Sequence, residues 1–311
     1  MFVSQHYKVI TFSLIIESTK IVRQTHVKLV GLASSIWIGT AQYRNTTFNI
    51  PSNRKLWLTL GQYDALVEYQ EVASRYYLAS FDIQKESFDA FLSRTSTATG
   101  VRLNSISLTN FREKQYQGYL VFPNASFDDF ITDFVDDVRF LIDPAFALSN
   151  IDGSKLDKLL DALSQKGVSP SIEKFKKDLY DYYRLLRNDV AHCLNKDYKN
   201  EYKALDKTAI ANFYTTLNEP KKKSQLSFDD FILCTANIKN IADLLTISLL
   251  PHIDWKQLVL KNKGKLIPRY VRFLQEGRTK RLHTYVLNRI KNLYGYALDE
   301  LMINNIIDSL E

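Results

Sequence analysis

A short segment near the middle of the chain combines an arginine, an amide and a histidine at helical spacing. Four residues separate Arg187 from His192, and the polar Asn188 directly follows the arginine. A histidine with a pKa near neutrality can take up or release a proton, and a guanidinium can donate two hydrogen bonds to phosphate oxygens. RNA carries its own nucleophile, the 2′-hydroxyl, so this combination of side chains is suited to cleaving a phosphodiester without a metal ion.

Helical geometry limits what these side chains can do within one chain. At about 100° per residue, Arg187 and His192 lie about 140° apart around a helix, whereas Asn188 and His192 are neighbours at i, i+4. Asn188 can therefore orient the imidazole. The arginine and the histidine do not converge on one point unless the helix ends before His192. A two-fold dimer could bring two such pairs around one cleft.

The Arg-x-x-x-x-His spacing, with a polar residue after the arginine, resembles the signature of the HEPN superfamily of helical-bundle proteins, many of which are ribonucleases. The resemblance covers residues 119–250, where an amphipathic helix precedes the motif. It implies that His192 acts as general base or acid, that Arg187 stabilises charge in the transition state and that Asn188 supports both. It also implies a homodimer that binds RNA in a composite cleft and leaves a 2′,3′-cyclic phosphate and a 5′-hydroxyl, without metal or cofactor.

Members of that superfamily commonly serve in phage defence, abortive infection and toxin–antitoxin systems. We therefore expect RNA as the substrate, with tRNA among the candidates, and an antitoxin or regulatory protein as a second partner. Two alternatives stay open. The chain could be a non-catalytic HEPN-like module that binds nucleotides, RNA or protein, or a helical scaffold outside the superfamily with a basic docking face.

Basic residues are concentrated towards the C-terminus. The formal charge is +7, from 41 Lys and Arg against 34 Asp and Glu, yet residues 256–292 hold 11 of the basic residues and one acid. Such an excess attracts polyanions and suits phosphate contacts. The candidate RNA-binding residues are Lys261, Lys263, Lys265, Arg278, Lys280 and Arg281. Arg278 and His283 repeat the Arg-x-x-x-x-His spacing, which we interpret as a coincidence of arginine density or as part of this surface.

Three other groups of residues could carry chemistry but have simpler explanations. Five aspartates crowd residues 128–137, and those at i, i+4 and i+8 fall on one face, as in a solvated helix, so we expect no metal site. Tyr180, Tyr182 and Tyr183 could stack on bases, but we assign them to core or dimer packing, because the chain contains 18 Tyr and 18 Phe. Cys193 follows His192 directly, and adjacent helical residues diverge too far to act as a pair.

Composition favours a mainly α protein. The chain of 311 residues is 45% hydrophobic and 24% charged, with only ten Gly and seven Pro, so long stretches run without a helix breaker. Two cysteines cannot form a disulfide framework, and the longest uncharged run is too short and too polar to span a bilayer. We expect a cytoplasmic location without membrane contact. No Walker A loop, dinucleotide-binding fingerprint or Gly-x-Ser-x-Gly elbow is present.

The expected architecture is an antiparallel HEPN-like helical bundle with additional N- and C-terminal helices. We divide it into a helical region over 1–118, the bundle over 119–250 and a basic helical region over 251–311. Periodicity and capping residues predict helices over 3–35, 55–95, from Ser126 and from Ser169 onwards, at about 200–218, after Ser227 and over 269–291 and 296–310. Residues 100–122 alternate mildly between apolar and polar, which leaves room for a small β-hairpin there.

Overall fold

The computed structural model describes residues 48–104, 107–192 and 198–310, so the helix expected over 3–35 lies outside it. Within these ranges the chain is mainly α-helical and contains no strand, which confirms the predicted fold class. The described residues form one compact unit. Its longer helices are α2 (Pro51–Ala79), α3 (Phe88–Thr99), α4 (Leu108–Tyr119), α5 (Val121–Leu141), α6 (Lys155–Gln165), α7 (Lys174–His192), α10 (Phe228–Leu249), α14 (Thr279–Tyr294) and α15 (Glu300–Asp308).

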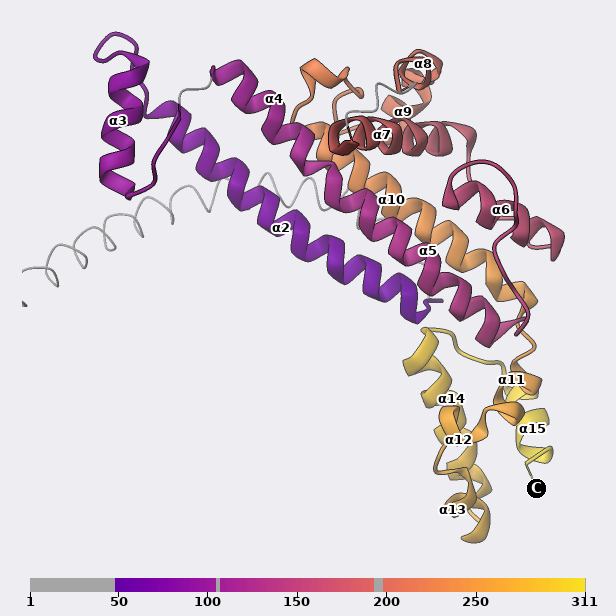
Figure 1. Ribbon diagram of the computed structural model, residues 1–311. Helices are drawn as coiled ribbons and strands as arrows, with labels where there is room; N and C mark the ends of the chain where they lie inside the picture. Colours follow the sequence, from indigo (N-terminus) through magenta and orange to yellow (C-terminus); the bar gives the residue numbers. More distant parts are fainter. Residues whose placement is uncertain (1–47, 105–106, 193–197, 311) are drawn as a thin grey trace, which may run out of the picture. The chain divides into compact units, whose positions relative to one another are not determined.

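Helices α5 and α10 pack against each other, and each also packs against α2 and α7, so that these four helices enclose most of the hydrophobic core (Figure 1). The start of α2 meets the far ends of α5 and α10, where the backbone N–H of Ser52 donates to Asp137 and Asn53 donates to Asp243. Helix α2 therefore runs antiparallel to both. Although α2 falls within the region 1–118, it contributes one side of this same bundle.

Short helices connect these long ones. Helices α8 (Tyr198–Ala204) and α9 (Lys207–Phe213) follow α7, and the 3-10 helix η1 (Lys223–Gln225) precedes α10. Helix α8 packs on α7, whereas η1 packs on α4. The C-terminal part adds η2 (Leu250–His252), α11 (Trp255–Lys261), α12 (Lys263–Leu266) and α13 (Tyr270–Gln275). Helices α4, α8 and α9 all contact α7, and η1 is joined to it through Lys223 and Asp189.

The C-terminal helices share the hydrophobic core of the bundle. The ring of Trp255 stacks on Tyr296 with centroids 5.5 Å apart, and Phe48 packs against Trp255 edge to face at 6.3 Å. The N–H of Asn49 donates to the carbonyl of Tyr294. These contacts join the segment before α2 to the helices after α10.

Several predicted helix boundaries are wrong for local reasons. Residues 108–119 form α4 instead of one half of a hairpin, because Ser107 caps a helix by accepting from the N–H of Asn110. Ser126 is buried inside α5, which begins at Val121 without any side-chain cap. Helix α7 begins at Lys174 and not at Ser169, after an extended stretch. Gly277, with φ of 63°, ends α13 and separates it from α14, where one helix was expected over 269–291.

The helix expected over 55–95 is interrupted, because α2 ends at Ala79 and α3 begins where the Ser87 side chain accepts from the N–H of Ala90. The predicted helix start at Ser227 is confirmed. At the start of α10, Ser227 and Asp230 form a reciprocal capping box. Among the described residues, the stretch Phe228–His252 is long and apolar enough to cross a membrane, but 61% of its most apolar window is buried inside the protein. Packing of α10 at the centre of the bundle accounts for that apolar character.

Candidate functional site

Helix α7 carries the arginine, amide and histidine of the motif, and its apolar face is fixed in the core. Leu179, Tyr180, Tyr183 and Leu186 are buried there, at i, i+1, i+4 and i+7. The Tyr180 ring meets Phe127 of α5 edge to face at 5.1 Å, and the Tyr183 hydroxyl donates to Asp230 of α10 over 3.0 Å. The orientation of α7 about its own axis is therefore set by contacts on two neighbouring helices.

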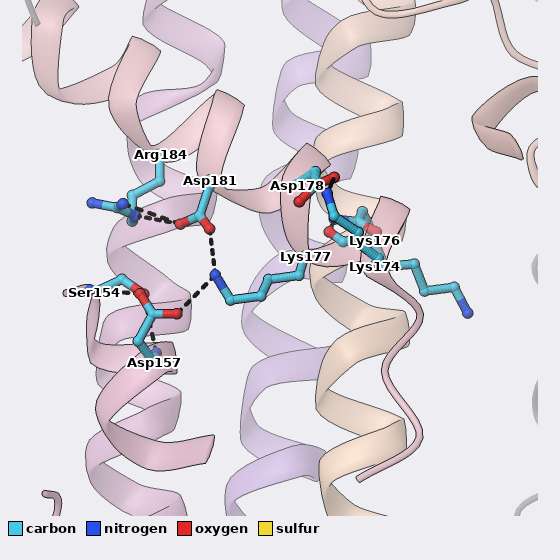
Figure 2. A network of polar contacts seen from close by, with 9 residues as sticks. Ser154, Asp157, Lys174, Lys176, Lys177, Asp178, Asp181 and Arg184 are labelled. Atoms are coloured by element: carbon cyan, nitrogen blue, oxygen red, sulfur yellow. Dashed lines mark hydrogen bonds and ion pairs between the residues drawn. The ribbon is translucent and has the colours of Figure 1, made fainter. Parts of the chain in front are cut away.

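A network of charged side chains holds the first half of α7 to α6 (Figure 2). The Lys177 ammonium lies 2.7 Å from both Asp157 of α6 and Asp181 one turn along α7. Burial lowers the pKa of Lys177, but hydrogen bonds to the two carboxylates outweigh it and hold the pKa above its ordinary value. Asp181 also accepts from Arg184 at 3.0 Å. Every charge in this group has a partner.

Arg187 is turned towards α5. Its Nη2 lies 3.1 Å from a carboxylate oxygen of Asp128, and the arginine side chain is only 15% exposed. The Nε atom is buried and has no hydrogen-bond partner among the described residues. The guanidinium is thus held in a partly buried ion pair with donor capacity left over.

In contrast to the partly buried Arg187, His192 is exposed to solvent and is the last residue of α7. Asn188 is half-buried one turn earlier, which keeps the expected i, i+4 relation between the two side chains. Because α7 continues to His192, the imidazole and the guanidinium leave the helix about 140° apart. In a single chain the structure does not bring Arg187 and His192 together. Cys193 lies outside the described residues.

Asp189, which the sequence analysis did not single out, is the buried acidic residue of this segment. Its side chain is 4% exposed, and its carboxylate lies 2.5 Å from the ammonium of Lys223 in η1. Tyr182, two turns earlier on the same side of α7, is also buried, and its hydroxyl donates to the carbonyl of Lys221. Together they attach the segment 221–223 to α7, on the face away from Arg187.

These contacts form one wall of a pocket of about 950 Å³ bounded by α4, α7, α8, η1 and the start of α9. Its basic lining residues are Lys199, Lys203, Lys207, Lys222 and Lys223. Its aromatic lining residues are Tyr182, Tyr198 and Tyr202. Glu113 is the single acidic lining residue. The lining therefore carries a marked excess of positive charge interleaved with aromatic rings.

Ion pairs neutralise only part of that charge. Lys223 pairs with Asp189, and Lys207 lies 3.8 Å from Glu219 while donating to the Tyr202 hydroxyl over 3.0 Å. Within the described part of the chain, Lys199, Lys203 and Lys222 form no ion pair, and all three are exposed. Burial raises the pKa of Tyr182, and so does the nearby Asp230 carboxylate. The Tyr182 side chain in the pocket wall is therefore a neutral phenol.

The predicted C-terminal basic surface is exposed but lies on other elements. All six candidate residues are exposed, on α11, α12, α14 and the turn before α14. Some of them already have partners: Lys265 lies over the ring of Phe140 at 4.2 Å, and Arg278 lies 2.9 Å from Glu276. His283 is half-buried, with an Nε2 atom that is buried and has no described partner. The second Arg-x-x-x-x-His match thus places its histidine against the protein, unlike His192.

The aspartates of α5 mostly have protein partners. Asp128 pairs with Arg187, Asp133 lies 2.7 Å from Lys55, and Asp136 lies 2.9 Å from Arg139. In the ranges that the structure covers, no group of three or more His, Cys, Asp or Glu is arranged to hold a metal ion. These carboxylates serve as partners for basic side chains on α2, α5 and α7.

The pocket could not be recognised in the sequence because its residues come from distant segments. The one feature of the pocket that is visible in the sequence is the run of three lysines at 221–223. This run follows Pro220 and is typical of a connecting loop. The lysines of α8 and α9 are spaced like those of an ordinary solvated helix. Comparison with protein-family models, with curated protein sequences and with solved structures finds no match to this chain.

Proposed function

We propose that this chain is a metal-independent endoribonuclease of the HEPN type that works as a homodimer. The observation that carries the proposal is the place of His192. It is exposed at the end of α7, one turn after Asp189, whose partner Lys223 lines the lysine-rich pocket. An acid–base group next to a concentration of positive charge is what cleavage of a polyanion requires.

The chemistry follows from the residue types. The His192 imidazole accepts the proton of a 2′-hydroxyl, the 2′-oxygen forms a bond to phosphorus, and the bond from phosphorus to the 5′-oxygen breaks. The leaving oxygen takes its proton from a second imidazole, His192 of the partner subunit. A guanidinium stabilises the charge on the phosphorane oxygens, the role that the family resemblance gives to Arg187. Asn188, one turn before His192, orients the imidazole.

A second candidate function is a module that binds RNA without cleaving it. The observation in its favour is that Asp128 already engages Arg187, on a face of α7 different from that of His192. In the nuclease, the dimer must assemble the two groups from different chains. In the binding module, Arg187 and Asp128 serve only to join α7 to α5.

The experiment compares RNA cleavage by wild type, His192→Ala and His252→Ala, all with EDTA present. His252 is the matched control, because it is also an exposed histidine at the end of a helix but lies on η2. Total tRNA and a structured RNA are the substrates, and the product ends are determined. We expect cleavage that leaves cyclic phosphate ends, a loss of about 10²- to 10⁴-fold in His192→Ala, and wild-type activity in His252→Ala.

Cleavage that survives in a folded His192→Ala variant would show that the site is wrong. If wild type binds RNA but cleaves none of it, the binding module is the correct function. A phage-defence, abortive-infection or toxin–antitoxin role belongs to the same proposal and predicts that expression of wild type, but not of His192→Ala, arrests growth.

A further inference from the structure

We propose that the pocket bounded by α4, α7, α8, α9 and η1 binds single-stranded RNA, with one unpaired base against its tyrosines and the flanking phosphates on its lysines. This inference rests on the proposed function, since it identifies the kind of RNA that reaches His192. It assigns RNA binding to this pocket, whose residues are separate from those of the C-terminal basic surface.

The charge of the pocket is the first argument. Five lysines line it against one glutamate, and when Asp189 and Glu219 are also counted, positive charges still exceed negative ones by two. Lys199, Lys203 and Lys222 are exposed and, in the described ranges, form no ion pair. Solvated ammonium groups that converge on one cavity are the usual means of holding a chain of phosphates.

The aromatic rings are the second argument. Tyr198 and Tyr202 are half-buried and contribute to the pocket wall, while Tyr182 is buried behind them with its ring centroid 5.4 Å from that of Tyr202. The Lys207 ammonium lies over the Tyr202 ring at 4.7 Å. Lysines interleaved with tyrosines match the known way of binding single strands, in which bases stack on rings while cations follow the backbone.

The shape of the ligand follows from that combination. In an A-form duplex the faces of the bases are covered by stacking, so a duplex can offer phosphates to the lysines but no base face to the tyrosines. An unpaired nucleotide offers both. On α7, His192 follows by one turn the Asp189 that pairs with Lys223 of the pocket lining, so we expect a strand held in the pocket to extend to the imidazole.

The test measures binding by fluorescence anisotropy in the His192→Ala background, where the RNA stays intact. The probes are a labelled 12-nucleotide single-stranded RNA and the same strand in a duplex. The key variant replaces Lys199, Lys203 and Lys222 with Gln, and it leaves Lys223 in place because that residue pairs with the buried Asp189. We expect the Kd for the single strand to rise at least about tenfold, and the slope of log K against log salt to become shallower by about 2.

Two matched controls separate this pocket from general electrostatics. Replacing Lys261, Lys263 and Lys265 with Gln removes the same charge from the C-terminal surface and should leave the Kd within about twofold of the parent. Tyr202→Leu removes the ring and should weaken single-strand binding about tenfold without changing the salt slope, whereas Tyr202→Phe should bind like the parent.

The inference is overturned if the pocket triple variant binds like the parent, if the C-terminal triple variant loses as much affinity, or if the duplex binds as tightly as the single strand. Its failure is distinguishable from that of the proposed function. Cleavage by wild type without pocket-dependent binding removes the pocket and leaves the nuclease. Pocket-dependent binding without any cleavage supports the pocket and removes the nuclease.

Discussion

Two groups of charged residues around α7 differ in how completely their charges are paired. Where α7 packs on α6, Lys177 lies between the carboxylates of Asp157 and Asp181, and Arg184 also pairs with Asp181 (Figure 2). Around the pocket at the other end of α7, the lysines of the lining outnumber the acidic residues beside them, and His192 is exposed. The first group therefore fixes α7 in place, while the second keeps lysines on α8 and before η1 that form no ion pair within the described ranges.

This difference separates structural from functional basic residues. A lysine with two carboxylates within hydrogen-bonding distance has little left to offer a ligand, because moving it would break existing contacts. A solvated lysine beside others of its kind carries a repulsion that a polyanion relieves.

The largest effect is expected at the buried pair of Asp189 and Lys223 beside the pocket. Lys223→Met leaves the Asp189 carboxylate buried without its ammonium, which should lower the free energy of unfolding by about 3 kcal/mol. Lys222→Met, at the exposed neighbouring position, should change it by less than about 0.5 kcal/mol. Urea denaturation of both variants measures the difference. Equal stabilities would mean that Asp189 does not depend on Lys223.

The next effect concerns Asp128, which holds Arg187. If Asp128 positions the guanidinium for catalysis, Asp128→Asn should reduce kcat about tenfold, whereas Asp129→Asn, at the exposed neighbouring position, should not. Single-turnover cleavage with saturating enzyme measures the chemical step. Partial recovery in Asp128→Glu would support positioning through the carboxylate, and unchanged kcat in a folded Asp128→Asn would assign the pair to structure alone.

A smaller effect is expected within the first half of α7. Lys177→Met removes the bridge between Asp157 and Asp181 and should lower the free energy of unfolding by about 1 kcal/mol. Lys174→Met is the control, because the Lys174 side chain is 83% exposed and pairs only with Asp178, so it should cost less than about 0.5 kcal/mol. Both variants should cleave RNA as fast as wild type. Reduced activity in a folded Lys177→Met variant would mean that the paired charges between α6 and α7 also affect cleavage.

The smallest effect is a pH dependence at the two capping-box aspartates. Burial raises the pKa of Asp157, but hydrogen bonds from Lys177 and Ser154 outweigh it and leave the pKa below its ordinary value. Its contribution to stability is therefore present above the pKa of the unfolded chain and is lost as pH falls through the folded pKa. Asp157→Asn should differ from wild type at pH 7 and converge with it towards pH 3.

At Asp230 the dependence of stability on pH has the opposite sign. Burial raises its pKa, and the hydrogen bonds that it accepts only partly offset this. Its contribution is fully present below the unfolded pKa and is lost as pH rises through the folded pKa, so the stability of wild type relative to Asp230→Asn should fall over that range. Free energies of unfolding between pH 3 and pH 7 measure both slopes. Slopes of the same sign would contradict the assignment.

Local signals predicted the helices well where a capping residue stands alone. Ser227 follows an irregular stretch, and it takes part in the capping box that begins α10. Ser126 has the same sequence around it, yet α4 passes into α5 at Leu120 with no change of composition to mark the junction. The alternation over 100–122 misled for a related reason, since a few apolar residues at even spacing do not distinguish a strand from the approach to a capped helix.

The candidate site was predictable only in its linear part. The motif residues Arg187, Asn188 and His192 are close in sequence, and all three lie on α7, which continues to His192. The partner of Arg187 lies 59 residues away on α5, and the partner of Asp189 lies 34 residues away on η1. Such pairs cannot be predicted from one sequence, because aspartates and lysines occur throughout the chain and nothing local indicates which of them meet.

Asp230 holds the backbone of the segment that carries Lys222 and Lys223. Its carboxylate accepts hydrogen bonds from the N–H groups of Lys221 and Ser227 and from the Tyr183 hydroxyl, so both ends of the segment 221–227 are fastened to one buried group at the start of α10. A loop tied at two points has already given up most of its conformational entropy before any ligand arrives. Lys222 and Lys223 are thus presented by a backbone that needs little further ordering, which leaves more of their interaction energy for affinity.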